Sequence, residues 1–204
     1  MQLTVWKFVG GRVCLDFVNT VGGRVRGVVV RDRLRGYEDL LAWSEAAGLI
    51  TGSEARILAR RATPRTTKAI ASRAMALRQA IYLLFRPRRD TEALTILNRE
   101  VAVARRHEHL LRARDEFRWQ WDDVPALDRM LWPLAHSAAE LLASSERARV
   151  RLCEGEDCGW LFLDTSRNGA RHWCDMKDCG NRAKVRRFRE RQRVADDPRR
   201  RAGS

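Results

Sequence analysis

Apolar residues recur at the three- and four-residue spacing of an amphipathic helix between Tyr37 and about residue 104. Residues that typically begin or end helices divide this stretch, namely Gly48, Thr51, Thr63, Pro64, Pro87 and Asp90. The pattern predicts four helices, over about 37–47, 51–62, 64–86 and 90–104. Their apolar stripes, which include Leu94 and Leu97, are expected to face a core.

The chain before Tyr37 lacks this helical period. Residues 3–20 alternate between apolar and small or polar positions, and Gly10-Gly11 marks a turn or bulge. Residues 22–27 combine glycine with arginine and predict a loop, while Val28–Val30 is either a short strand or loop packing. We therefore expect a few short strands beside the helices.

Alternation returns between residues 110 and 121, where two short runs flank a charged turn and predict a β-hairpin. Phe117, Trp119 and Trp121 would share one face of this hairpin. Exposed rings could stack on bases, but packing against helices is the simpler interpretation, and we expect the rings in the core. A helix from Pro125 to about Ser145 should follow, kinked or split by Pro133.

Four of the five cysteines form two pairs with the same internal gap, Cys153/Cys158 and Cys174/Cys179. Two short loops at this spacing bring four thiolates to one tetrahedral Zn²⁺. Two disulfides would use the same atoms, but nothing in the sequence is typical of secretion, and cytosolic thiols stay reduced. We predict one structural zinc ion, because four cysteines leave no coordination position for a catalytic water.

The sequence around these pairs predicts a treble-clef-like finger. Residues 160–163 are a short apolar strand, residues 164–169 are rich in turn formers, and Arg171–Trp173 would return as the second strand. Residues 181–193 contain neither glycine nor proline and favour a helix. A unit this small buries little apolar surface, so the metal would supply much of its folding free energy.

The second knuckle ends in the tetrapeptide Cys179-Gly180-Asn181-Arg182. With this tetrapeptide, the cysteine spacing and the expected hairpin, residues 150–193 resemble the CGNR zinc finger of bacterial stress-induced transcription regulators. Residues 9–20, Val-Gly-Gly-Arg-Val-Cys-Leu-Asp-Phe-Val-Asn-Thr, are similar to part of their N-terminal domain, which is called ABATE. The resemblance implies a finger that binds DNA and an N-terminal domain that regulates it, for example by sensing a ligand.

The charge of the chain favours an anionic partner, because the formal net charge is +14 and the pI is about 10.9. The excess is spread along the chain but is densest in the expected C-terminal helix. Residues 182–193 hold seven basic residues and one acid. Such a helix suits the major groove of duplex DNA, where arginine contacts guanine or phosphate.

The predicted nucleic-acid contacts come from this helix and from the expected hairpin. Val185 and Phe188 lie on a separate side of the helix and would pack back onto Trp160 or Trp173. RNA is the alternative polyanion, and the choice of DNA follows from the resemblance. The contact residues expected are Arg182, Lys184, Arg186, Arg187, Arg189, Arg191 and Arg193, with Arg167 and Arg171 on the hairpin.

Three polar residues stand among apolar neighbours near the N-terminus: Asp16, Asn19 and Thr20. They either cap a helix or brace a loop, which the residues alone favour, or bind a small-molecule effector, and the resemblance narrows the difference between these alternatives. An enzyme could use them as an active site. The sequence has no nucleophile–base pair, catalytic metal cluster or cofactor fingerprint, however, and we expect no enzymatic activity.

Together these patterns predict a mainly α N-terminal domain with a few short strands (residues 1–148), a treble-clef-like finger (149–195) and a disordered tail (196–204). No run of about eighteen apolar residues spans a membrane, and the first residues lack the apolar stretch of a signal peptide. We therefore expect a cytoplasmic protein. A lone small finger would bind a short site weakly, which favours a homodimer.

Overall fold

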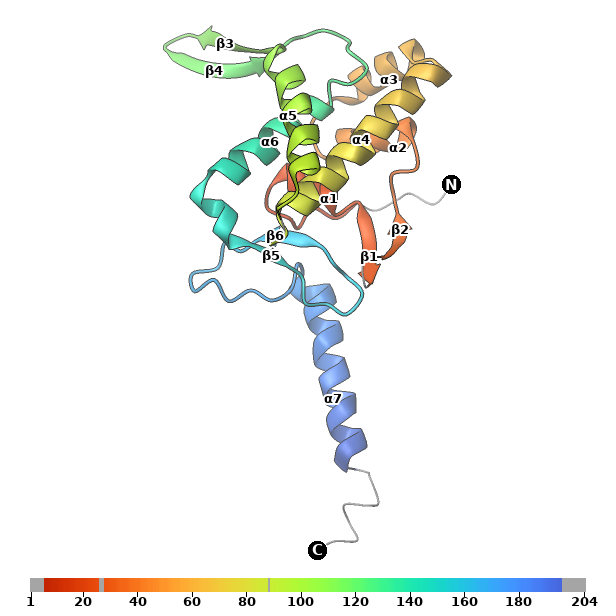
Figure 1. Ribbon diagram of the computed structural model, residues 1–204, viewed down its shortest axis with the longest axis vertical. Helices are drawn as coiled ribbons and strands as arrows, with labels where there is room; N and C mark the ends of the chain where they lie inside the picture. The colour runs from red at the N-terminus through yellow and green to blue at the C-terminus, as the bar shows by residue number, and fades with distance from the viewer. Residues whose placement is uncertain (1–5, 26–27, 88, 196–204) are drawn as a thin grey trace, which may run out of the picture.

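The computed structural model describes residues 6–25, 28–87 and 89–195, and Figure 1 shows a mainly helical body with a long helix projecting from one end. Three short strand pairs accompany the helices. The predicted fold class, a mainly α N-terminal part followed by a finger with a hairpin and a helix, is confirmed. The tail over 196–204 lies outside the described residues.

Among the described residues, the body contains six α-helices: α1 (Val13–Val18), α2 (Tyr37–Ala46), α3 (Gly52–Arg61), α4 (Pro64–Leu84), α5 (Thr91–Arg105) and α6 (Leu131–Ala143). Helix α5 packs against both α4 and α6, the short α1 lies against α4 and α6, and α2 contacts α3 and α4. Phe17, Trp43, Leu77, Ile81 and Met130 are among the fully buried side chains of the core between them.

Helix ends follow the predicted cap residues. The side chains of Thr51, Thr63 and Asp90 each accept a hydrogen bond from a backbone N–H in the first turn of the helix that follows. Gly48 follows α2 with a φ of +72°, a left-handed conformation that glycine adopts without strain. Local sequence therefore fixed the bounds of α2 to α5 closely. Leu94 is an exception to the predicted stripe, because its side chain is 46% exposed.

The part of the chain that the structure describes also contains three antiparallel strand pairs: β1 (Val21–Val25) with β2 (Val28–Asp32), β3 (Glu108–Ala113) with β4 (Glu116–Trp121), and β5 (Val150–Leu152) with β6 (Leu161–Leu163). The loop expected from residue 22 is wrong, since residues 21–25 pair with residues 28–32 as a strand. The strand alternative for Val28–Val30 is confirmed.

The helix expected from Pro125 begins only at Leu131, and the kink expected at Pro133 does not occur. Asp122, which precedes this segment, hydrogen-bonds to the ring nitrogens of His107 and His109 at the base of the β3–β4 hairpin. Pro133 lies in the first turn of α6, where the backbone N–H has no intrahelical partner. A proline at this position therefore removes no helical hydrogen bond.

The core position expected for the β4 aromatic residues is wrong for two of the three. Phe117 and Trp119 are 63% and 67% exposed, whereas Trp121 packs against Trp132 and His136 of α6. The hairpin extends beyond the helices in Figure 1, so that only its base reaches them. Alternation therefore fixed which residues share a face, and the position of the hairpin left that face exposed.

The finger is joined to the helical body through β6. Leu161 and Leu163 belong to the main core, and the N–H of Leu163 donates to the carbonyl of Gly10 over 2.8 Å. The Asn19 side chain pairs with both backbone groups of Leu161, donating over 2.8 Å and accepting over 2.9 Å. The indole N–H of Trp160 donates to the carbonyl of Val21 over 2.8 Å. Body and finger therefore share one packed interface.

Asp16 braces the turn before α1. Its carboxylate accepts the N–H of Gly10 over 2.7 Å, and burial raises the pKa of this carboxyl to about 6, although hydrogen bonds from Gly10 and Val9 oppose the rise. The folded protein therefore binds a proton here more tightly than the unfolded chain does. Asp16 contributes stability that is present below pH about 4 and is lost as the pH rises through about 6.

We predict that Asp16→Asn gains stability relative to the native protein as the pH rises from about 4 to about 7, by an amount on the order of 3 kcal/mol. Asparagine does not ionise, so any change that the amide itself causes in the free energy of unfolding is the same at every pH in this range. Chemical denaturation at several pH values measures the difference. Asp39→Asn is the control with the opposite slope, because Arg35 lowers the pKa of Asp39. A pH-independent difference for Asp16→Asn would contradict the prediction.

Candidate metal centre and nucleic-acid interface

Four thiols converge where the finger meets the body. Cys153 follows β5, Cys158 precedes β6, Cys174 ends an extended segment, and Cys179 lies in a single π-helical turn, Met176–Gly180. All four are buried, and their Sγ atoms lie within 4.8 Å of one another. Two of the Sγ–Sγ distances are 3.6 and 3.7 Å. These distances match the separation of about 3.8 Å between thiolates around a tetrahedral zinc ion.

The same distances exclude the two-disulfide alternative, because a disulfide places its sulfur atoms about 2 Å apart. All four cysteines are free thiols. The donor set is therefore that of a closed, structural Cys₄ site, and the prediction of one structural zinc ion is confirmed.

The four thiols lie so close together that each affects the ionisation of the others. Hydrogen bonds from Cys158 and Cys174 lower the pKa of Cys153 to about 2, and the bonds to Cys153 raise the pKa of Cys158 and that of Cys174. The backbone N–H groups of Gly155 and Cys174 also point at the Cys153 sulfur. Without a cation one thiolate is stabilised at the expense of the others, whereas a divalent cation favours the thiolate form of every ligand.

Two glycines occupy crowded positions beside the thiols, and Gly155 lies where the two knuckles approach each other. A Cβ on Gly155 would lie 3.1 Å from the Cys179 sulfur, and one on Gly180 would lie 2.4 Å from the Met176 sulfur. The second distance is shorter than real Cβ contacts, so a side chain at Gly180 would displace the Met176 side chain, which is 50% exposed.

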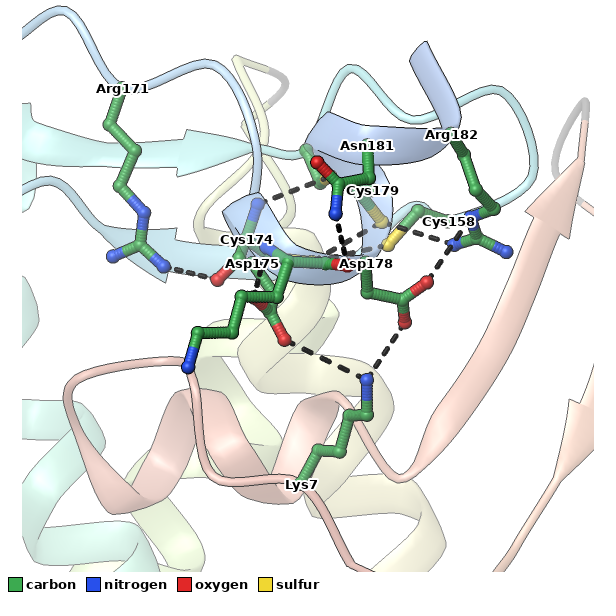
Figure 2. A network of polar contacts seen from close by, with 11 residues as sticks. Lys7, Cys158, Arg171, Cys174, Asp175, Asp178, Cys179, Asn181 and Arg182 are labelled. Atoms are coloured by element: carbon green, nitrogen blue, oxygen red, sulfur yellow. Dashed lines mark hydrogen bonds and ion pairs between the residues drawn. The ribbon is translucent and has the colours of Figure 1, made fainter. Parts of the chain in front are cut away.

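The last two residues of the Cys-Gly-Asn-Arg tetrapeptide stabilise the π-helical turn, as Figure 2 shows. Asn181 donates its side-chain N–H to the carbonyl of Lys177 over 3.1 Å. The Arg182 guanidinium donates to the Cys179 sulfur over 3.2 Å and pairs with Asp178 at 3.3 Å. A zinc ion with four thiolates carries a net charge of about −2, and a guanidinium against one sulfur offsets part of that charge.

Lys7 connects the N-terminal segment to the metal site. Its ammonium group donates to Asp178 over 2.8 Å and lies 3.7 Å from Asp175 (Figure 2). The hydrogen bond to Asp178 raises the pKa of Lys7, and the same bond lowers the pKa of Asp178. Sequence reasoning missed Lys7. Nothing near it in the chain signals a partner 171 positions away.

The strand expected over Arg171–Trp173 is wrong, because β6 pairs with β5 across the first knuckle instead. The return segment is held by Asp164, whose buried carboxylate accepts the N–H and hydroxyl of Ser166 and the N–H of Arg171. These hydrogen bonds, that from the Ser166 side chain above all, lower the pKa of Asp164 to about 2. The Asp164 side chain therefore supplies hydrogen bonds to the return segment that the backbone of a paired strand would otherwise have supplied.

The two basic residues predicted on this segment differ in their surroundings. Arg171 is directed into the finger, where it donates to the carbonyls of Trp173 and Cys174 and lies over the ring of Phe162 at 4.5 Å. Arg167 is exposed on the loop after β6. Of the two, Arg167 keeps its guanidinium on the surface.

Helix α7 (Asn181–Ala195) carries the predicted basic cluster and projects away from the body in Figure 1. Its main contact is the preceding π-helical turn, and its seven basic side chains are exposed. Some are nevertheless engaged with the finger: Arg186 pairs with Glu156, and the Arg187 guanidinium lies 5.6 Å from the centre of the Trp173 ring.

The packing expected for the apolar residues of α7 is wrong. Val185 and Phe188 are 48% and 56% exposed. Trp160 is buried against the body, and Arg187 instead occupies the position over Trp173. The helix is therefore attached at its beginning only, and most of its circumference is open.

Asp16, Asn19 and Thr20 are buried, and each is hydrogen-bonded within the protein. Asp16 accepts from Gly10, and Asn19 pairs with Leu161. The Thr20 hydroxyl donates to the carbonyl of Phe17 and accepts from Arg78. This geometry is that of the structural alternative: Asp16 and Thr20 bond within the body, and Asn19 joins the body to the finger. Effector binding at these residues stays a prediction.

The fold and the four-thiol centre define a zinc-finger protein with a helical N-terminal domain. The description "CGNR zinc finger" belongs to a family model that matches residues 149–192, and "Putative stress-induced transcription regulator" belongs to the ABATE model, which matches residues 11–145. Because this second match covers well over half of the chain, the protein belongs to the ABATE family. No curated protein matches the chain. Among the described residues, no helix has the length and apolar character needed to cross a membrane.

We predict that Cys174→Ser lowers the zinc content from about one ion per chain to near zero, because a hydroxyl is a poor substitute for a thiolate ligand. Elemental analysis of the purified full chain measures this content. The thermal stability of the body should fall as well, since Leu161 and Leu163 lie in its core. Cys14→Ala is the matched control, as Cys14 lies outside the cluster. Equal zinc content in the native protein and Cys174→Ser would contradict the assignment.

We predict that Arg182→Gln weakens zinc binding about 10- to 100-fold, the usual effect of losing a hydrogen bond to a metal ligand. Competition with a chromogenic chelator measures the affinity. Arg189→Gln removes the same charge from the same helix, and no described contact links Arg189 to a thiol, so it should leave the affinity unchanged. Equal losses in the two variants would show that only the net charge of α7 matters.

Proposed function

We propose that this protein is a DNA-binding transcription regulator and that α7 enters the major groove of duplex DNA. The observation that supports this function is an exposed helix with seven basic residues and one acidic residue, attached at its start to a zinc centre. An α-helix with its side chains is about 10–12 Å in diameter and the major groove is about 12 Å wide, so the helix can lie in the groove along its length of about 22 Å.

The finger fixes the direction of this helix. The zinc knuckle holds Cys179, the π-helical turn leads directly into Asn181, and Arg182 and Arg186 tie the first two turns to Asp178 and Glu156. Acidic residues of the first knuckle, Glu154, Glu156 and Asp157, are exposed. They would repel phosphates on that side. DNA would therefore approach α7 from the side away from this knuckle.

The helical body is proposed to regulate binding through the interface it shares with the finger. Lys7 and Asn19 connect the body to the π-helical turn and to β6, respectively. An effector or a second copy of the chain that shifts the body would change the orientation of α7 through these contacts. Regulation in this form needs no catalytic group, in agreement with the expected absence of enzymatic activity.

The test is selection of bound sequences from a random duplex DNA library by the zinc-loaded full chain at near-physiological salt. We expect enrichment of a motif and a steep fall of affinity with salt, because each phosphate contact releases counterions. Arg189→Ala/Arg193→Ala should weaken binding about tenfold or more and reduce the salt slope by about 2. Arg60→Ala/Arg61→Ala removes the same charge from the exposed surface of α3 and should have little effect.

Equal effects of the two double variants would contradict a role for α7 and leave only a general affinity for polyanions. Tighter binding of structured RNA than of duplex DNA at equal salt would identify the finger as an RNA-binding module. Absence of binding to either polymer would overturn the proposed function and point to a finger that contacts protein.

A further inference from the structure

One face of α7 carries no charge. Val185, Phe188 and Gln192 follow one another at spacings of three and four residues and form a single stripe along the helix. Gln192 is exposed, as are the two apolar residues. The exposed valine and phenylalanine side chains bury little apolar surface within the protein, because the helix projects from the body. The stripe is therefore a candidate contact surface for another molecule.

Two basic strips border the stripe. With 3.6 residues per turn, Lys184 and Arg191 lie about 70–90° to one side of it, and Arg189 and Arg193 lie about 70–110° to the other. The opposite face of the helix is turned to the finger, since Ala183 is half-buried, Arg186 pairs with Glu156 and Arg187 lies over Trp173. The uncharged stripe therefore lies at the centre of the side that is open to a partner.

A polyanion fits this arrangement better than a second copy of the helix. Two α7 helices packed stripe to stripe would bring their basic strips together, and the repulsion would oppose the contact. A DNA groove presents base edges in its centre and a phosphate backbone along each side. The charges of α7 are complementary to that pattern, with uncharged residues in the middle and cations on both flanks.

We propose that Val185, Phe188 and Gln192 read base edges in the major groove, while the four flanking basic residues contact the two phosphate backbones. This inference rests on the proposed DNA binding and adds the residues and the base chemistry of recognition. Glutamine pairs with the N6 and N7 of adenine, and apolar side chains contact the C5-methyl group of thymine. The stripe spans about 10 Å along the helix, or about three base pairs. The recognised core should therefore contain A·T pairs.

The experiment uses the zinc-loaded full chain, the sequence selected by it, and the variants Gln192→Ala and Phe188→Ala. Both side chains are exposed, so the variants should fold and retain zinc, which circular dichroism and elemental analysis verify. We expect the preference for adenine over the other bases at one position of the site to be about 5- to 150-fold smaller in Gln192→Ala than in the native protein. The dependence of its affinity on salt concentration should remain that of the native protein. Lys184→Ala/Arg191→Ala should show the reverse pattern, with a smaller salt slope and unchanged base preference.

Replacing single thymines of the selected site by deoxyuridine tests the apolar contact, because uracil lacks only the methyl group. The native protein should bind the substituted site more weakly at one position, and Phe188→Ala should bind both sites equally. Native base preference in both variants would overturn the inference while leaving DNA binding by α7 intact. Self-association of the free protein that Phe188→Ala abolishes would assign the stripe to a second copy. If the native protein binds no DNA, the proposed function itself is refuted.

Discussion

Four thiolates within 4.8 Å of one another repel unless a cation lies between them. This constraint governs the C-terminal part of the protein. In residues 150–180 the only paired strands among the described elements are two of three residues each. The knuckles are therefore held together largely by the metal and by hydrogen bonds such as those to Asp164. The metal fixes Cys179, Cys179 fixes the π-helical turn, and the turn sets the start and direction of α7. The position of the proposed DNA-binding helix thus depends on an ion that it does not itself ligate.

The finger is nevertheless not an independent unit attached by a linker. Leu161 and Leu163 extend the core of the helical body, and Asn19 pairs with the backbone of Leu161 as a neighbouring strand would. Removing the Asn19 amide would leave two buried backbone groups without partners, which typically costs about 1–3 kcal/mol for each group. Lys7 adds a second connection at the metal site. Such an interface lets the body influence the orientation of α7 without a separate signalling element.

The seven basic residues of α7 divide into two groups by their contacts. Arg182, Arg186 and Arg187 hold the helix to Cys179, Glu156 and Trp173, respectively, and so act within the protein. Lys184, Arg189, Arg191 and Arg193 border the uncharged stripe and are placed to contact phosphates. A count of basic residues treats these groups alike. The contacts of the finger distinguish them, because among the described residues only the first group has an acidic, sulfur or aromatic partner that the finger supplies.

The sequence by itself determined what depends on local spacing and chemistry. The caps at Thr51, Thr63 and Asp90 set helix starts within a residue, and the two cysteine pairs specified the metal site. Only the tertiary structure decided which faces became buried. It left Phe117, Trp119, Val185 and Phe188 exposed, paired β6 with β5, and directed Asn19 and Lys7 to partners more than a hundred residues away. Periodicity shows which residues share a face, but what that face meets depends on contacts between elements distant in the chain, and no local pattern encodes those contacts.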